Sequence, residues 1–152
     1  EDVPTTDAVT LFSDSLCYLT DFEDVVSVFE AVYDHLEEGG IFLFDVHSLY
    51  QMQEVFPGYQ YHFVEDDFAF LWQSYELDEP GSVEHVIDMY IKQEDGNLFE
   101  HFQEVHEEQT FPIEMYEAAL EMVGFTNIKV KAEFGQSEVQ ETSPRWFFQA
   151  VK

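Results

Sequence analysis

Short apolar runs and a segment with helical spacing make up the first part of the chain. The runs DAVTLF (7–12) and IFLFDV (41–46) are nearly unbroken, which is typical of strands buried on both faces of a parallel sheet. Between them, apolar side chains recur every three or four residues, from Phe22 to Leu36. The pattern therefore predicts a strand, an amphipathic helix and a second strand parallel to the first.

Polar residues and glycines set the limits of this predicted helix. Thr20 and Glu23 have the spacing of a capping box, in which each side chain bonds the backbone N–H group of the other residue. Gly39 follows the last apolar position and suits the left-handed backbone that ends many helices. We therefore expect a helix between Thr20 and Gly39.

The pattern changes to a period of two between residues 59 and 109. Such alternation is typical of half-exposed antiparallel strands, and DEPGS and EDGN supply turn residues between the last three of them. The sequence therefore predicts an antiparallel sheet inserted after the second parallel strand. Its four expected strands are YHFVE (61–65), FAFLWQSYEL (68–77), VEHVIDMYIKQ (83–93) and NLFEHFQEVHEEQ (97–109).

Helical spacing returns after the insertion. Pro112 suits the first turn of a helix, and Gly124 with Phe125 suits its end. The segments NIKVKAEF (127–134) and RWFFQAV (145–151) predict two closing strands.

The charge of the chain excludes several kinds of partner. The 152 residues include 33 acidic and 5 basic side chains, a formal net charge of −28. Such a surface repels phosphate backbones and anionic membranes, so we expect neither nucleic acid nor membrane as a partner. With 45% hydrophobic and 17% aromatic residues, the chain has enough apolar material for a packed core. No membrane-span or signal-peptide pattern occurs, so the sequence predicts a cytoplasmic protein.

Polar side chains follow both predicted parallel strands. Ligands of open α/β sheets bind at the carboxyl ends of the parallel strands, and two such ends would bring these groups together. Each group alone could instead serve a local turn or cap. The candidates are Ser13, Asp14, Ser15 and Tyr18 after the first strand, and Asp45, His47, Ser48 and Tyr50 after the second.

The histidines and the single cysteine give weaker signals. Counting back from an Asp95-Gly96 turn pairs His85 with His106 across a hairpin. No HExxH or comparable ligand spacing occurs, so the sequence favours solvated strand histidines and no metal. Cys17 excludes an internal disulfide and is expected to be a small core residue. The chain also has no GxG, GxSxG or GxxxxGK[ST] pattern, so a self-contained dinucleotide site is not expected.

The order of these elements resembles that of the class I S-adenosylmethionine-dependent methyltransferases. LEEGGIFLFDV is similar to the family's helix, glycine stop and strand, and the closing ALEMVGF helix and RWFFQAV strand follow in the same order. The resemblance implies an α/β, Rossmann-like sheet with strands four to seven of that fold, and the cofactor-binding N-terminal half outside this chain. In that scheme residues 1–58 and 110–152 form the core and residues 59–109 form a substrate cover, all within one domain.

LFSDSLCYL looks like the segment after the fourth strand in small-molecule N-methyltransferases of the glycine-methylating type. By that match Asp14 stands where asparagine is common, and Tyr18 stands where histidine is common. The resemblance implies S-adenosylmethionine as the cofactor, with contacts from Phe12, Ser13, Asp14 and Tyr18. It places Ser15, Asp45, His47 and Tyr50 on the substrate side.

The function that the resemblance implies is methyl transfer to a small-molecule acceptor, by preference an amine. Such chemistry depends on positioning and desolvation, so no catalytic residue is assigned. The alternatives are a non-catalytic acidic interaction module built on a partial methyltransferase fold, and a nucleotide-using α/β enzyme of another type. The oligomeric state is left open, a homodimer included.

Overall fold

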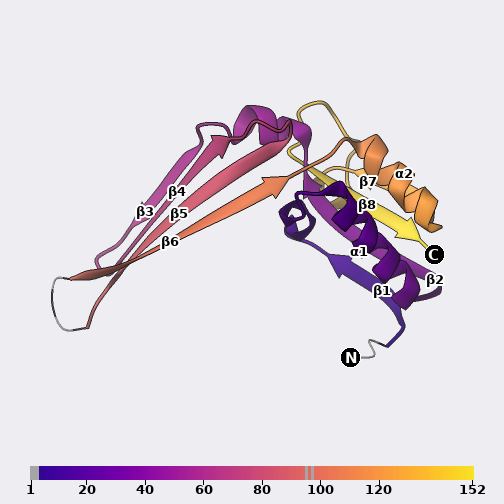
Figure 1. Cartoon of the computed structure of the whole chain (residues 1–152), viewed down its shortest axis with the longest axis horizontal. Helices are drawn as coiled ribbons and strands as arrows, with labels where there is room; N and C mark the ends of the chain where they lie inside the picture. The colour runs from indigo at the N-terminus through magenta and orange to yellow at the C-terminus, as the bar shows by residue number, and fades with distance from the viewer. Residues whose placement is uncertain (1–3, 95, 97) are drawn as a thin grey trace.

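The computed structural model describes residues 4–94, 96 and 98–152; Asp95 of the predicted turn lies outside them. It contains two four-stranded sheets, one in the body of the molecule and one that projects from it (Figure 1). No helix in the described residues is long and apolar enough to cross a membrane.

The sheet in the body has the strand order β1-β2-β8-β7. Strands β1 (Thr6–Leu11) and β2 (Leu36–His47) are parallel, as predicted. Strand β8 (Arg145–Val151) runs antiparallel to β2 and to β7 (Thr126–Lys131). The predicted strand 127–134 is too long, because β7 ends at Lys131. Glu133 and Phe134 have φ angles of 50° and 55° and form a short 3-10 helix instead of extended backbone.

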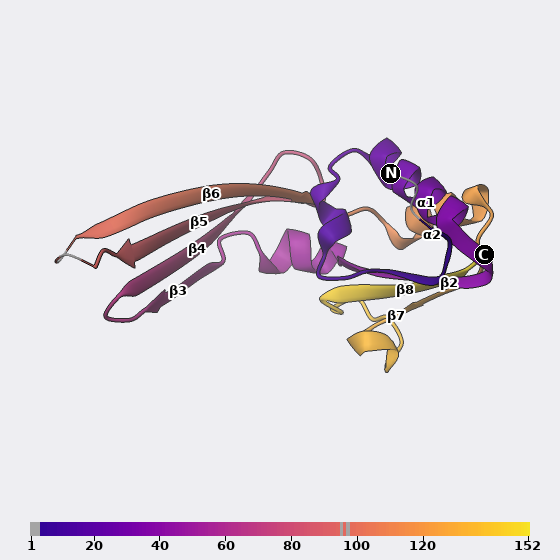
Figure 2. The same ribbon diagram turned by 90° about the horizontal axis from the view of Figure 1, so that it is seen from below.

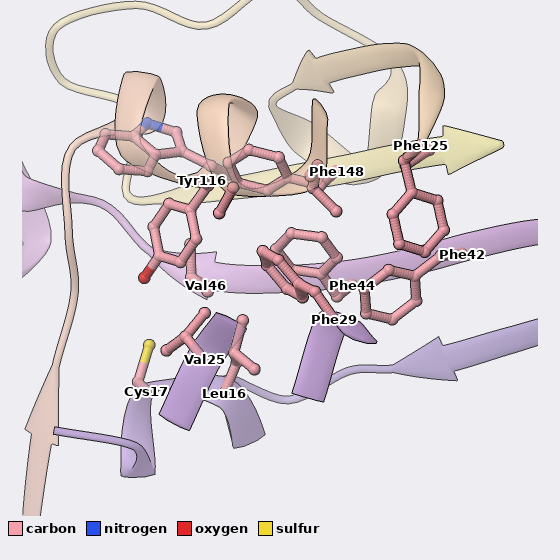
Figure 3. Packing of buried hydrophobic residues seen from close by; sticks show 14 of the residues in the cluster. Leu16, Cys17, Val25, Phe29, Phe42, Phe44, Val46, Tyr116, Phe125 and Phe148 are labelled. Carbon is pink, nitrogen blue, oxygen red and sulfur yellow. The ribbon is translucent and has the colours of Figure 1, made fainter. Parts of the chain in front are cut away.

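Helices α1 (Phe22–His35) and α2 (Ile113–Val123) cover one face of this sheet (Figure 2). Their apolar sides close on alternate side chains of β2 and β8, and Phe44 stacks on Phe148 with 4.6 Å between ring centroids. Figure 3 shows this core, which is rich in aromatic rings and includes Phe29, Phe42 and Tyr116. Burial of these rings is the main apolar contribution to the stability of the body.

The ends of α1 differ from the prediction. Asp21 caps the helix, not Thr20, because the Asp21 carboxylate accepts a hydrogen bond of 3.0 Å from the Glu23 N–H group. The helix ends at His35, four residues before Gly39, and buried Leu36 begins strand β2. The ammonium of Lys152 donates to the carbonyls of Tyr33 and Leu36, so these carbonyls are satisfied without a glycine cap.

The end of α2 follows the prediction. Gly124 has a φ of 120°, and its N–H group bonds the Glu121 carbonyl at 3.1 Å while the Phe125 N–H group bonds the Leu120 carbonyl at 3.0 Å. This is the paired bonding of a Schellman cap. A Cβ atom at Gly124 would also meet the Tyr33 ring at 3.0–3.2 Å, so both the backbone angle and the space require glycine.

The projecting sheet is antiparallel, with the order β3-β4-β5-β6. Its strands are β3 (Gln60–Val64), β4 (Phe68–Glu76), β5 (Ser82–Lys92) and β6 (Phe99–Gln109), and a short π-helix (Gln51–Val55) connects it to β2. This is the insertion that the alternating pattern predicts. His85 pairs with His106, which confirms the register counted from the sequence.

Candidate functional site

The carboxyl end of β1 turns sharply toward the projecting sheet. Ser13 and Asp14 both have left-handed backbone, with φ angles of 63° and 53°, and a 3-10 helix (Ser15–Tyr18) follows. The Cys17 N–H group donates to the Asp14 carbonyl at 2.7 Å. Cys17 itself is fully buried, which confirms it as a core residue, and burial raises the pKa of its thiol. The turn leaves the Asp14 side chain at the edge of the body.

Asp14 meets the end of β2 and the start of β8. His47 Nε2 lies 2.9 Å from Asp14 Oδ2, and Arg145 Nη1 donates to Asp14 Oδ1 at 3.0 Å. Arg145 also forms an ion pair with Asp45, whose side chain is 2% exposed. Because β8 runs antiparallel to β2, its first residue stands at the carboxyl end of β2, and this places a cation between the two carboxylates.

The projecting sheet contributes the other side of the cluster. Glu108 lies on β6 with 4% exposure, and its Oε2 atom is 3.7 Å from His47 Nε2. Its Oε1 atom is 3.9 Å from Nε2 of His85 on β5. The buried hydroxyl of Ser74 lies 2.7 Å from His85 Nδ1 and fixes that ring. Among the described residues, Glu108 Oε2 has no hydrogen-bond partner.

Burial and neighbouring charges shift the titration of these groups in different directions. Burial raises the pKa of Asp14, but the hydrogen bonds and charges of His47 and Arg145 outweigh it and hold the pKa below its usual value. Burial raises the pKa of Glu108 more than the charge of His47 lowers it. Burial also lowers the pKa of His85 to about 4, so its imidazole is neutral at pH 7.

A cavity of about 300 Å³ lies between the two sheets and against this cluster. One side is polar and comes from the ends of β1, β2 and β8. The connecting segment and the projecting sheet supply the aromatic rings, and the projecting sheet adds His85, His106 and Glu108. Such a mixture of apolar walls and a few convergent polar groups is typical of small-molecule sites. The lining residues are Asp14, Tyr18, His47, Phe56, Phe70, Trp72, His85, Ile87, His106, Glu108 and Arg145.

Further hollows lie beside this cavity and elsewhere on the body. One, of about 310 Å³, is lined by Phe12, Ser13, Asp14, Asp45, Phe134 and Arg145. Because Asp14 and Arg145 line both this hollow and the cavity, the two spaces meet at that pair. A larger hollow of about 400 Å³ runs along the open face of the sheet beside Lys129, Phe134 and Phe147. It has no comparable cluster of buried polar groups, so its greater size does not make it the better site.

The structure brings together six of the nine residues that the sequence singled out. Asp14, Tyr18 and His47 line the cavity, Asp45 lies behind them, and Phe12 and Ser13 line the adjoining hollow. The remaining candidates do not line the cavity. The Ser15 hydroxyl donates to the Phe12 carbonyl, the Ser48 hydroxyl accepts from the Gln51 N–H group, and Tyr50 precedes the π-helix.

Four ionisable residues that line the cavity were not assigned to a site from the sequence. Glu108 and Arg145 were not singled out, and His85 and His106 were interpreted as solvated. Arg145 could have been found, because a closing antiparallel strand must begin at the carboxyl end of its neighbour. Glu108 carried no such signal, since glutamate is frequent along β6 and only the packing of the two sheets buries this one.

Comparisons with known proteins give the class of protein that this fold matches. A solved S-adenosylmethionine-dependent methyltransferase from Clostridium acetobutylicum ATCC 824 is similar with a TM-score of 0.86 and 26% identity, over 99% of this chain and 60% of that chain. The sugar N-methyltransferase KedS8 from Streptoalloteichus sp ATCC 53650 has a TM-score of 0.71 over 98% of this chain and 57% of that chain. At 21% identity, KedS8 shows the fold alone. The chain has an α/β, methyltransferase-like fold with one mixed and one antiparallel sheet.

Two curated bacterial proteins are similar in sequence. "Putative methyltransferase YqeM" of Bacillus subtilis (strain 168) is 38% identical over 146 residues, which are 96% of this chain and 58% of that protein. A protein of the same description from Geobacillus sp. (strain WCH70) is 37% identical over 146 residues, 96% of this chain and 59% of that protein. The chain thus spans less than two thirds of the length of both relatives. No family model matches it.

The relatives and the structural neighbours named here are methyltransferases by description, and those with solved structures share the class I fold. The predicted resemblance to S-adenosylmethionine-dependent methyltransferases is confirmed for the fold and for the description of the relatives. The narrower likeness to the glycine-methylating type stays a prediction.

Proposed function

We propose that this chain forms the acceptor-binding part of an S-adenosylmethionine-dependent methyltransferase. The observation that carries the proposal is the cavity at the carboxyl ends of the two parallel strands, closed on its far side by the projecting sheet. This is the position where open α/β sheets bind ligands. The similarity to methyltransferases over 96% of the chain supports the same conclusion.

In this proposal the methyl donor and the acceptor occupy adjoining spaces. Phe12 and Ser13 face the donor in their hollow, and His47 and the aromatic wall face the acceptor in the cavity. Tyr18, for which the resemblance implies a donor contact, lines this cavity as well. Asp14 belongs to both spaces, so the methyl group would pass beside it. Two hydrogen-bonded partners, His47 and Arg145, hold the Asp14 carboxylate in one orientation.

S-adenosylmethionine, when bound, supplies a methyl group on a positively charged sulfur. That methyl group would pass to a lone pair of the acceptor as its bond to sulfur breaks, and the acceptor would lose a proton to solvent. The residues of this chain position the acceptor and exclude water from the path, which is the main source of rate in such transfers. Asp45 acts indirectly, because its buried carboxylate holds Arg145 in place.

We propose a small-molecule acceptor with an amine nitrogen. Aromatic rings of Phe56, Phe70 and Trp72 beside the carboxylates of Asp14 and Glu108 form a setting that attracts a cationic or partly cationic group. The printed name of KedS8, a sugar N-methyltransferase, is consistent with this class of acceptor. Ser15 and Tyr50 remain proposed on the substrate side from the resemblance alone.

Several broader predictions stay proposals. They are a donor-binding segment with a glycine-rich loop before this chain, one domain built from residues 1–58, 59–109 and 110–152, and a cytoplasmic location. The sequence immediately upstream tests the first of them. The non-catalytic interaction module is not favoured, because the relatives are described as enzymes.

Isothermal titration of the intact protein with S-adenosylhomocysteine tests the proposal. We expect saturable heat, and we expect Asp14→Asn to weaken binding about tenfold, since the exchange removes a charge at the wall between the two spaces. Asp34→Asn makes the same exchange on the exposed side of α1 and should bind as the parent does. Folded protein that gives no heat would overturn the proposal.

A further inference from the structure

Three side chains of metal-ligating type converge at the floor of the cavity. Asp14 follows β1, His47 ends β2 and Glu108 lies on β6, so three separate elements bring them together. One ligating atom from each, a ring nitrogen or a carboxylate oxygen, lies within 4.8 Å of the other two. His47 Nε2 is at the centre, 2.9 Å from Asp14 Oδ2 and 3.7 Å from Glu108 Oε2.

The Glu108 carboxylate is an independent sign that a ligand is missing from this group. Its side chain is 5% exposed, and among the described residues Oε2 has no partner at ordinary hydrogen-bond geometry. Burial raises the pKa of this carboxylate and outweighs the Tyr18 hydroxyl, which is near enough to lower it. A buried carboxylate oxygen without a partner is costly, so native proteins pair such atoms with a donor or a cation. Oε2 faces His47 Nε2, so the unsatisfied atom points into the cluster and not away from it.

We propose that Asp14, His47 and Glu108 bind a divalent transition metal ion. Metal–ligand bonds of about 2.1 Å at tetrahedral or octahedral angles separate ligand atoms by roughly 3.0–3.4 Å. The separations of 2.9 and 3.7 Å from His47 Nε2 bracket that range, and the third pair, Asp14 with Glu108, lies within 4.8 Å. Side-chain rotations of the two carboxylates would bring the three atoms to ligand distances. A neutral His47 imidazole would coordinate the ion through the lone pair of Nε2 and keep its single proton on Nδ1.

The surroundings of the three ligands fit such a site. Arg145 holds the second oxygen of Asp14, and its own charge is shared with Asp45, so Oδ2 remains directed at His47. On the other side, Ser74 fixes the ring of His85, whose Nε2 faces the second oxygen of Glu108 at 3.9 Å. Outer partners of this kind orient ligands and often change metal affinity by about 10- to 100-fold.

The mixed ligand set selects the class of ion. One imidazole and two carboxylates suit Zn²⁺, Mn²⁺ or Fe²⁺, whereas Ca²⁺ and Mg²⁺ prefer oxygen ligands alone. Three protein ligands leave coordination positions open, and these would face the cavity and could take an acceptor atom. Metal binding at these residues can be measured without the methyl donor or the acceptor, so it can be tested separately from methyl transfer.

Titration of the intact protein with Zn²⁺ and with Mn²⁺ tests the inference by calorimetry. We expect one saturable site for at least one of these ions, with Mg²⁺ binding much more weakly. Visible absorption of bound Co²⁺ then reports direct coordination by nitrogen and oxygen.

Variants separate this site from adventitious binding by an acidic chain. Glu108→Gln should weaken binding by about tenfold or more and alter the Co²⁺ spectrum, and Glu108→Asp should restore part of the affinity. Glu107→Gln removes the same charge from the exposed side of β6 and should leave the metal affinity and the Co²⁺ spectrum unchanged. Circular dichroism checks that each variant is folded. Absence of saturable metal binding, or equal losses of affinity in Glu107→Gln and Glu108→Gln, would overturn the inference. Glu108 would then be expected to pair with an organic cation instead of a metal ion.

Discussion

The two sheets of this molecule use aromatic side chains in opposite ways. In the sheet of the body, rings such as Phe44 and Phe148 are buried under α1 and α2. In the projecting sheet, one face carries a row of rings that no helix covers, and Phe63 and Phe102 remain 43% and 42% exposed. The aromatic side chains of the body sheet therefore contribute mainly to the stability of the fold. In the projecting sheet, the rings of Phe70 and Trp72 form a wall of the cavity where the two sheets meet.

The largest expected effect is the loss of a core ring. Phe44→Ala removes a fully buried side chain between Phe29 and Phe148, and we expect the free energy of unfolding to fall by about 3 to 5 kcal/mol. Denaturant unfolding followed by circular dichroism measures it. A loss below about 1 kcal/mol would show that the body is not held by this core.

The next largest effect concerns the polar link at the edge of the body. Arg145→Met leaves the buried carboxylate of Asp45 without its cation, so we expect a loss of about 3 kcal/mol in the free energy of unfolding. Lys92→Met is the control, since Lys92 is exposed on the projecting sheet. Equal stability of the two variants would mean that the Asp45 ion pair contributes nothing.

The third effect is a dependence of stability on pH at the junction of the sheets. The ordinary pKa of His85 is 6.5, and burial lowers it to about 4 in the folded protein. Between these values the unfolded chain binds more protons, so the free energy of unfolding falls as the pH is lowered from 6.5 toward 4. We expect this loss to be about 2 to 3 kcal/mol larger in the parent than in His85→Gln. Parallel pH profiles of the two proteins would contradict the buried, neutral state of His85.

The smallest effect is expected on the uncovered face. Phe102→Ala removes a ring that is 42% exposed, and we expect a change below about 1 kcal/mol in the free energy of unfolding. The same chemical exchange at Phe44 is the matched comparison. If thermal unfolding shows equal losses at the two positions, the contrast between the sheets is wrong.

The fold could be predicted from the sequence wherever one pattern dominated. Unbroken apolar runs identified β1 and β2, and counting back from the Asp95-Gly96 turn gave the register of His85 with His106. The end of α1 could not be predicted, because Lys152, far along the chain, caps its carbonyls in place of Gly39. The turn at Glu133 and Phe134 was also missed, since neither residue type signals left-handed backbone.

The candidate site was predictable only on its first side. Strand ends pointed to Asp14 and His47, because both follow apolar runs directly. Glu108 and the aromatic wall depend on how the projecting sheet packs against the body, and no local pattern encodes that contact. The metal inference arose in the same way, since its ligands come from three distant segments and have no recognisable spacing.

The central claim is that a methyl donor and its acceptor meet at the wall formed by Asp14 and Arg145. A crystal structure of the intact protein with S-adenosylhomocysteine tests it most directly. The account predicts the sulfur atom beside Asp14, in the hollow with Phe12 and Ser13 and directed toward the cavity between the sheets. A ligand bound away from that wall, for example beside Lys129 and Phe134 on the open face, would contradict it.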